Sequence, residues 1–142
     1  MKARDEGSIL PLTIFYGVLA LVLVLLVTAA TSLYLERKRL FTVADGASLV
    51  GAEAFELDRV TQTDGRFDAH LKSSDVATAV RGYLTGGGVT RFDRLTVDRA
   101  ESSDGRSATV ALSARWTPPV VSLLVPGGIR IAVTSTARSV FR

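Results

Sequence analysis

The side chains of this sequence that could bind a metal ion are few. Asp64 and Asp68 flank a short turn, Asp64-Gly-Arg-Phe-Asp68, and paired carboxylates can bind calcium. The full spacing of a calcium-binding loop is absent, which favours a solvated loop. His70 is the only histidine and the chain has no cysteine, so no second histidine and no cysteine can join His70 in a zinc site. The sequence therefore predicts no metal site.

Candidate nucleophiles and phosphate-binding residues are also isolated. Ser8, Ser48 and Ser113 lie in no motif that supplies a general base. The run Gly86-Gly-Gly88 lacks the lysine and the serine or threonine of a phosphate-binding loop, and it follows a predicted helix instead of opening one. It is more typical of a flexible turn. Trp116 is expected to pack in the core or at a sheet edge. We expect neither an enzyme nor a cofactor.

The size and charge of the chain exclude further classes. Its 142 residues leave room for one domain. The net charge is only +3, and the arginines are scattered among acidic residues, so a nucleic-acid partner is not expected. The absence of cysteine excludes disulfides without fixing the compartment.

The dominant element is an apolar stretch near the N-terminus. Gly7 to Leu35 carries no charge, and its apolar centre, Ile9 to Ala30, is 22 residues long. As a helix this centre measures about 33 Å, which matches a hydrocarbon core of roughly 30 Å. The sequence predicts a membrane partner for residues 1–35, an N-terminal tail followed by one transmembrane helix.

A cleaved signal peptide is the alternative for this stretch. A cleavage site could lie near Ala30, but the apolar region is much longer than that of a signal peptide, which favours an uncleaved anchor. Lys2 and Arg4 precede the span and Arg37 to Arg39 follow it. This count slightly favours a C-terminus inside, but a tail of about 100 residues translocates regardless of so small a bias.

The helix is expected to continue beyond the membrane. From Leu33 to about Leu57, apolar or small residues recur every three or four positions, so we expect one helix from near Leu12 to near Asp58. Its second half, about 36–58, is amphipathic. Small residues on this stripe let another element approach closely. The predicted close-packing positions are Ala44, Ala47, Gly51 and Ala54. They would pack on the chain's own domain and, in addition, on neighbouring copies or partner helices.

The remaining residues predict a short helix and three strands. The helix spans about 74–85, with a serine cap and the glycine run at its end. The strands span about 91–99, 107–116 and 129–138, and Asp104-Gly105 joins the first two as a hairpin. Leu95 and Val97 share one face of the first strand, and Ile129 begins an inward row in the third.

These elements predict an α+β fold. An antiparallel sheet of three strands with one apolar face needs a cover, and the amphipathic half of the long helix is the only large apolar surface available. A long N-terminal helix, half in the membrane and half laid across a small sheet, resembles the architecture of a pilin. Residues 36–142 would form the extracytoplasmic domain.

The N-terminal third of the chain resembles a known family. The residues that carry the likeness are Gly7-Ser-Ile at the start of the helix, the run YLERKRL at Tyr34–Leu40, and ADGASLVGAEA at Ala44–Ala54. Together they resemble the TadE, TadF and TadG proteins of Tad/Flp pilus assembly, most closely a TadG-like N-terminal segment. The similarity covers about Asp5 to Ala54.

This resemblance implies a minor pilin or pseudopilin of a Tad/Flp-type pilus or secretion system. Such a protein spans the bacterial cytoplasmic membrane once, with its N-terminus inside and its C-terminal domain outside, and can enter a surface pilus. The implied partners are other pilins, pilus-assembly membrane proteins and prepilin peptidase, which would cut between Gly7 and Ser8. The chain departs from the pilin pattern at Leu12, the fifth residue after that cut, where pilins carry a glutamate. TadG-like members generally lack this glutamate.

The alternative function is a membrane-anchored or secreted extracytoplasmic binding domain that is not part of a pilus. Cleavage near Ala30, or a soluble monomer with a specific ligand, would favour it. An enzyme has no supporting group of residues in the sequence.

Overall fold

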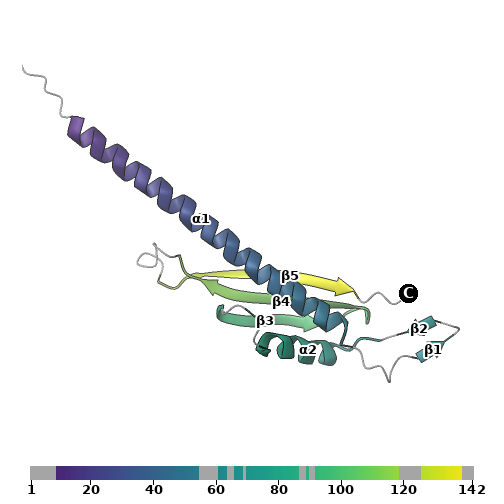
Figure 1. The fold of residues 1–142 in the computed structure, drawn as a ribbon. Coiled ribbons are helices and arrows are strands. Elements are labelled where there is room, and N and C mark those ends of the chain that lie inside the picture. The colour runs from purple at the N-terminus through teal and green to yellow at the C-terminus, as the bar shows by residue number, and fades with distance from the viewer. Residues whose placement is uncertain are drawn as a thin grey trace, which may run out of the picture.

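The computed structural model describes residues 9–54, 61–63, 66–68, 70–86, 89, 92–118 and 126–138. Within these ranges lie two helices and five strands (Figure 1). In chain order they are α1 (Ile9–Ala52), β1 (Thr61–Thr63), β2 (Arg66–Asp68), α2 (Ser73–Thr85), β3 (Asp93–Glu101), β4 (Ser107–Trp116) and β5 (Ile129–Arg138). The α+β fold predicted from the sequence is confirmed.

The long helix α1 has 44 residues and is continuous from its apolar half into its amphipathic half. Pro11 lies in the first turn, where the missing N–H has no partner to lose. Within the described residues, α1 is the one helix long and apolar enough to cross a membrane. Its apolar side chains from Ile9 to Val27 are largely exposed, because no other part of the described chain covers them.

The C-terminal end of α1 comes earlier than predicted. The helix ends at Ala52 instead of near Asp58, and residues 55–58 lie outside the described part of the chain. Glu53 still donates its backbone N–H to Leu49 O, but Ala54 donates to Gly51 O, three residues back, at 3.3 Å. This tightened last turn satisfies a carbonyl group that the helix would otherwise leave free.

The three-stranded sheet is antiparallel, in the order β3-β4-β5. The pairing of β4 with β5 is unbroken, from Ser107 opposite Arg138 to Trp116 opposite Ile129. The pairing of β3 with β4 is irregular in two places, and Arg94 beside one of them has a positive φ of 50°. β3 spans 93–101, two residues later than the predicted 91–99.

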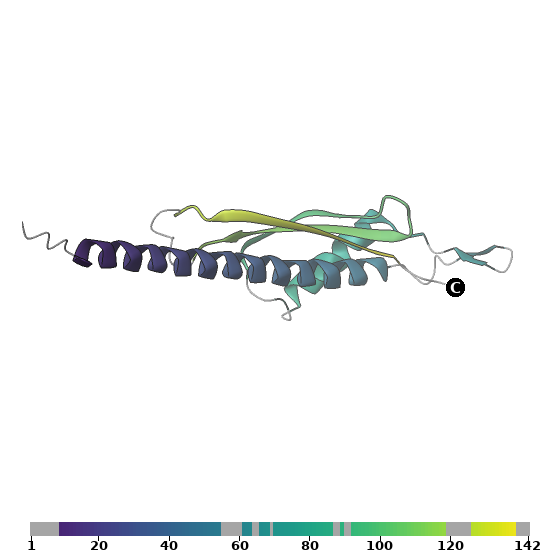
Figure 2. The ribbon, with the colours of Figure 1, turned by 90° about the horizontal axis from the view of Figure 1, so that it is seen from above.

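The helices α1 and α2 cover one face of the sheet, and the core lies between them and it (Figure 2). The clean alternation predicted in β4 is present, since every second side chain from Ala108 to Trp116 is buried. The completely buried apolar side chains are Leu40, Ala44, Ala47, Val76, Val80, Ala108, Val110 and Leu112.

One predicted inward position, Ile129, is wrong, and Val97 is not buried alongside Leu95, with which it was predicted to share a face. Ile129 is 46% exposed, because it begins β5 at a corner of the sheet, and the buried row of that strand starts at Ile131. Val97 is 37% exposed, although Leu95 is half-buried as expected. The irregular pairing on both sides of Val97 bends β3, so a strict two-residue alternation does not hold there.

The connection between α1 and α2 contains a short hairpin that the sequence did not predict. β1 pairs with β2 from Thr61 opposite Asp68 to Thr63 opposite Arg66. α2 then begins one residue before its predicted start, with Lys72 as the N-cap and no side-chain capping bond. The predicted serine cap is therefore wrong. The helix ends at Thr85, and the backbone N–H of the C-cap residue Gly86 donates to Tyr83 O at 3.3 Å.

Candidate functional site

The predicted close-packing positions of α1 pack against the chain's own sheet and against α2. Ala44 and Ala47 are fully buried, and Gly51 is also buried. A Cβ atom added at Gly51 would lie 3.1 Å from Val76 Cγ1 and 3.2 Å from Ala108 Cβ, which leaves almost no room for a side chain. Ala54 is half-buried against the same core. Contacts of these positions with a second subunit stay a prediction.

The glycine at position 46 lets α2 approach α1. A Cβ atom added there would clash with the hydroxyl group of Tyr83 on α2. Tyr83 packs half-buried against the core. The small residues of the stretch 44–54 therefore serve two neighbours, the sheet and α2, at different angles around the helix.

A polar cluster joins the same part of α1 to β5. The Ser135 hydroxyl donates to Asp45 Oδ1 at 3.0 Å and lies 3.3 Å from the Ser48 hydroxyl. Ser48 also donates to Asp45 O at 2.8 Å. Ser48 and Ser135 are buried, so each of these bonds satisfies a polar group that would otherwise be costly to bury.

A second polar contact joins the helix to the other end of the sheet. The indole N–H of Trp116 donates to the Ser32 hydroxyl at 3.3 Å, and the Trp116 side chain is buried, in the position expected from the sequence. Ser32 comes directly after the apolar span, whereas Asp45 lies thirteen residues further along α1. Bonded at both places, the sheet and the amphipathic half of α1 form one structural unit.

The isolated residues with chemical potential do not come together. Within the described parts of the chain, no three acidic or histidine side chains gather as a metal site would require. Exposed His70 lies against Gly105 in the β3–β4 turn. Ser113 accepts a hydrogen bond from Arg130 at 3.0 Å. Asp64, Gly7 and Ser8 lie outside the described residues, so the structure does not place the predicted cleavage site.

One carboxylate has a strongly perturbed pKa, but for a structural reason. The backbone N–H groups of Arg106 and Ser107 donate to Asp104 Oδ1 at 2.9 and 2.7 Å, and the Ser107 hydroxyl donates to Oδ2 at 2.8 Å. These bonds stabilise the charged form and lower the pKa of Asp104 to about 2. Asp104 therefore holds the turn between β3 and β4, and nothing around it suggests catalysis.

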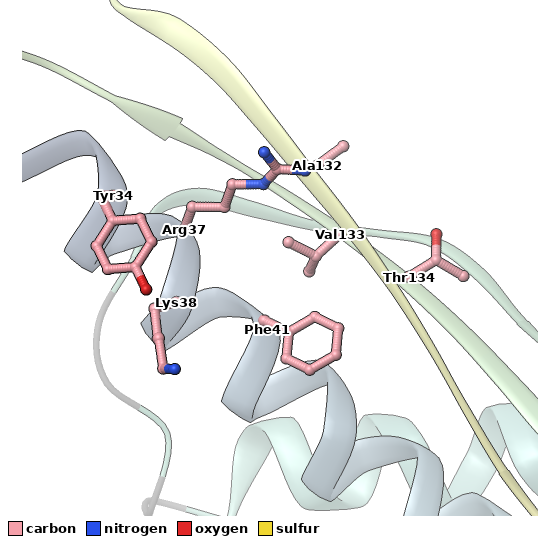
Figure 3. A pocket seen from close by; sticks show the side chains of 7 residues that line it. All are labelled: Tyr34, Arg37, Lys38, Phe41, Ala132, Val133 and Thr134. Carbon is pink, nitrogen blue, oxygen red and sulfur yellow. The ribbon is translucent and has the colours of Figure 1, made fainter. Parts of the chain in front are cut away.

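A groove between α1 and β5 is the surface feature that sequence reasoning missed. We call it the α1–β5 groove. Its outer part has a volume of about 550 Å³ and is lined by Tyr34, Arg37, Lys38 and Phe41 of α1 and by residues 132–134 of β5 (Figure 3). The spacing of Tyr34, Arg37 and Phe41 places them on one side of the helix. That spacing was a signal in the sequence, but only the position of β5 makes it a groove.

Comparison with known proteins finds a family similar to the first part of the chain. Residues 7–54 match the Tad family, whose description is "Putative Flp pilus-assembly TadE/G-like". The match covers about a third of the chain and ends two residues after α1. The match thus includes both the apolar span and the part of α1 that packs against the sheet. No curated protein and no solved structure is significantly similar to the chain.

Proposed function

We propose, from the membership of residues 7–54 in the Tad family of Flp pilus-assembly TadE/G-like proteins, that this chain is a minor pilin or pseudopilin. The family match supports a role in pilus assembly in general, and the single apolar helix suggests a single-pass membrane anchor. The finer role, that of a structural subunit acting without catalysis, is the proposal. In it the N-terminus lies inside the cell and the sheet domain outside.

The observation that carries this proposal is the division of α1 into two halves. The side chains of the apolar half, up to about Val27, are exposed, whereas the second half packs against the sheet. An exposed apolar helix can be covered by lipid or by the helices of other subunits. In the proposed mechanism, lipid covers it before assembly and neighbouring pilin helices cover it afterwards. The sheet domain moves with α1 into the fibre, because it is packed and hydrogen-bonded to the second half of that helix.

The test is complementation of a strain that lacks this gene. Replacing Ile9–Ala30 with a polyleucine span of equal length keeps an anchor but changes every helix-packing surface. We expect the deletion to reduce piliation, the natural chain to restore it, and the polyleucine chain to reach the membrane without restoring it. Normal piliation in the deletion strain would reject the role in assembly. Restoration by the polyleucine chain would reject the helix-packing mechanism.

The mass of the mature N-terminus separates the two forms of the proposal. A chain that starts at Ser8 in native membranes would support cleavage by prepilin peptidase and entry into a fibre. A chain that keeps Met1 or starts at Lys2 would support a permanent membrane protein that assists assembly. A start near residue 31 would instead favour the anchorless, secreted binding domain.

A further inference from the structure

We propose that the α1–β5 groove binds the headgroup of an anionic phospholipid at the membrane surface. This inference goes beyond the role in pilus assembly and does not depend on it. A second cavity of about 420 Å³ adjoins the outer part, and the two share Tyr34, Arg37 and Ala132 in their walls. They therefore form one continuous groove along α1.

The groove begins where the membrane ends. The inner cavity starts at Ala30, the last residue of the apolar span, and its walls include Leu33 and Ile131. Lys38 in the outer part lies eight residues further along α1, about 12 Å at the helical rise. The headgroup layer of one leaflet is roughly 5–8 Å thick, and long basic side chains can reach back towards it. The groove thus spans the level of lipid headgroups.

Two of the three basic side chains that line the groove, Arg37 and Lys38, have no acidic partner in the described residues. Arg37 and Lys38 are exposed and unpaired there. The third basic residue of the groove, Arg130, lies 2.8 Å from Asp98, and Arg39 outside the groove lies 3.8 Å from Glu36. Two free cations beside a membrane surface attract anionic lipid, whose phosphate accepts hydrogen bonds from both side-chain types.

The aromatic residues of the groove, Tyr34 and Phe41, are suited to the membrane interface. Tyr34 is 64% exposed and lies just past the apolar span, where amphipathic aromatic rings favour the membrane interface. In Figure 3 the Arg37 side chain extends from α1 towards Ala132, and Phe41 lies near Val133. The groove walls combine apolar and cationic side chains, so they can contact both the acyl chains and the phosphate of a phospholipid.

A lipid fits this groove better than the apolar helix of a second copy. Such a helix has no acidic residue between Ile9 and Leu35, so docking it here would bury Arg37 and Lys38 against an uncharged surface. Burying an unpaired charge is strongly unfavourable. An anionic headgroup instead supplies the missing negative charge.

The experiment measures lipid retained by the full chain in dodecyl maltoside micelles with equal amounts of phosphatidylglycerol and phosphatidylcholine. Native mass spectrometry gives the ratio of the two lipids. Each basic side chain near an anionic surface contributes a factor of about five in binding, so Arg37 and Lys38 together are expected to give roughly a 25-fold preference for phosphatidylglycerol. The double variant Arg37→Gln/Lys38→Gln is expected to retain both lipids equally.

The control variant Arg81→Gln/Arg138→Gln removes the same charge from exposed residues outside the groove and is expected to keep the preference. Equal retention of both lipids by the natural chain would overturn the proposal, as would an equal loss in the control. A cross-linked dimer through Thr134→Cys that the groove variant abolishes, with the lipid ratio unchanged, would assign the groove to a second copy. Because all five substituted side chains are exposed, each variant should remain folded.

Discussion

Asp45 belongs to the run of small residues that resembles the Tad family, yet its role is not that of a small residue. Its carboxylate accepts a hydrogen bond from the hydroxyl group of Ser135, ninety positions later in the chain, at 3.0 Å. This bond fixes the position of β5 against α1 at the level where Ala44 and Ala47 meet the sheet. One acidic residue within the helix thus helps to define the register between helix and strand.

The coupling between Asp45 and Ser135 can be measured with a double-mutant cycle. Asp45→Ala and Ser135→Ala should each lower the free energy of unfolding, and the two effects should couple by about 1 kcal/mol, the usual net value of such a hydrogen bond. Urea unfolding of the full chain in micelles provides the measurement. Strict additivity of the two substitutions would show that the bond contributes nothing. The pair Thr42→Ala and Ser135→Ala, which shares no contact, is the control.

Asp104 predicts a dependence of stability on acid pH. Its pKa in the folded chain is about 2, below the ordinary 3.8, because backbone N–H groups of Arg106 and Ser107 bond the carboxylate. The Asp104 carboxylate therefore becomes protonated at a lower pH in the folded state than in the unfolded state. Its stabilising effect is fully present above pH 3.8 and is lost as the pH falls towards 2.

Two measurements test this effect. The carboxyl resonance of Asp104 should titrate with a midpoint near 2 by NMR, and Asp104→Ala should lower the thermal unfolding midpoint at pH 7. The difference between the variant and the natural chain should shrink as the pH approaches 2. Ser103→Ala, next to it and exposed, should change neither quantity. A midpoint near 3.8 would show that the turn does not hold the carboxylate.

At the scale of elements, the two halves of α1 have different surroundings and therefore different distributions of apolar side chains. Its first half is apolar on all sides, as lipid or neighbouring helices require, and its second half is apolar on the side that meets the sheet. Glycine is therefore present for different reasons in the two halves. Gly17 has no atom within 4 Å of an added Cβ, whereas Gly51 has Val76 and Ala108 in contact.

A matched pair of substitutions tests this difference. Gly51→Leu should destabilise the domain by about 1–3 kcal/mol or more, because the core around it has no space for a side chain. Gly17→Leu should leave the stability of the domain unchanged, although it adds the same side chain to the same helix. Resistance to limited proteolysis in micelles is the measurement. If both variants resist equally, the packing at Gly51 is looser than the distances indicate.

At the scale of the whole molecule, the proposed function requires the sheet domain to lie outside the cytoplasmic membrane. The charges on both sides of the span do not decide this orientation, as the sequence alone already indicated. The anchor and the domain are continuous through α1, so the side of the membrane on which any one surface residue lies fixes that of the whole domain.

The absence of cysteine makes the orientation simple to measure. A membrane-impermeant maleimide should label Ser103→Cys, in the exposed β3–β4 turn, in cells whose outer membrane has been permeabilised. It should label Lys2→Cys only after the inner membrane is opened. The reverse pattern would place the domain in the cytoplasm and contradict a pilin role. The natural chain is the control for background labelling.

The sequence by itself determined the features that depend on neighbouring residues. An uncharged apolar run long enough to span a bilayer predicts an anchor, and the strict alternation of residues 107–116 predicts a strand with one buried face. The bounds of β4 and β5 agree with their predicted ranges, because turn residues mark both ends of β4 and the start of β5.

Only the tertiary structure decided which distant segments meet. A stripe of small residues does not say what covers it, and the structure assigns Ala44, Ala47 and Gly51 to the chain's own core. The irregular pairing of β3, the exposure of Ile129 and the bond between Asp45 and Ser135 also depend on partners far away in sequence. The α1–β5 groove exists for the same reason, since its two walls come from residues almost a hundred positions apart.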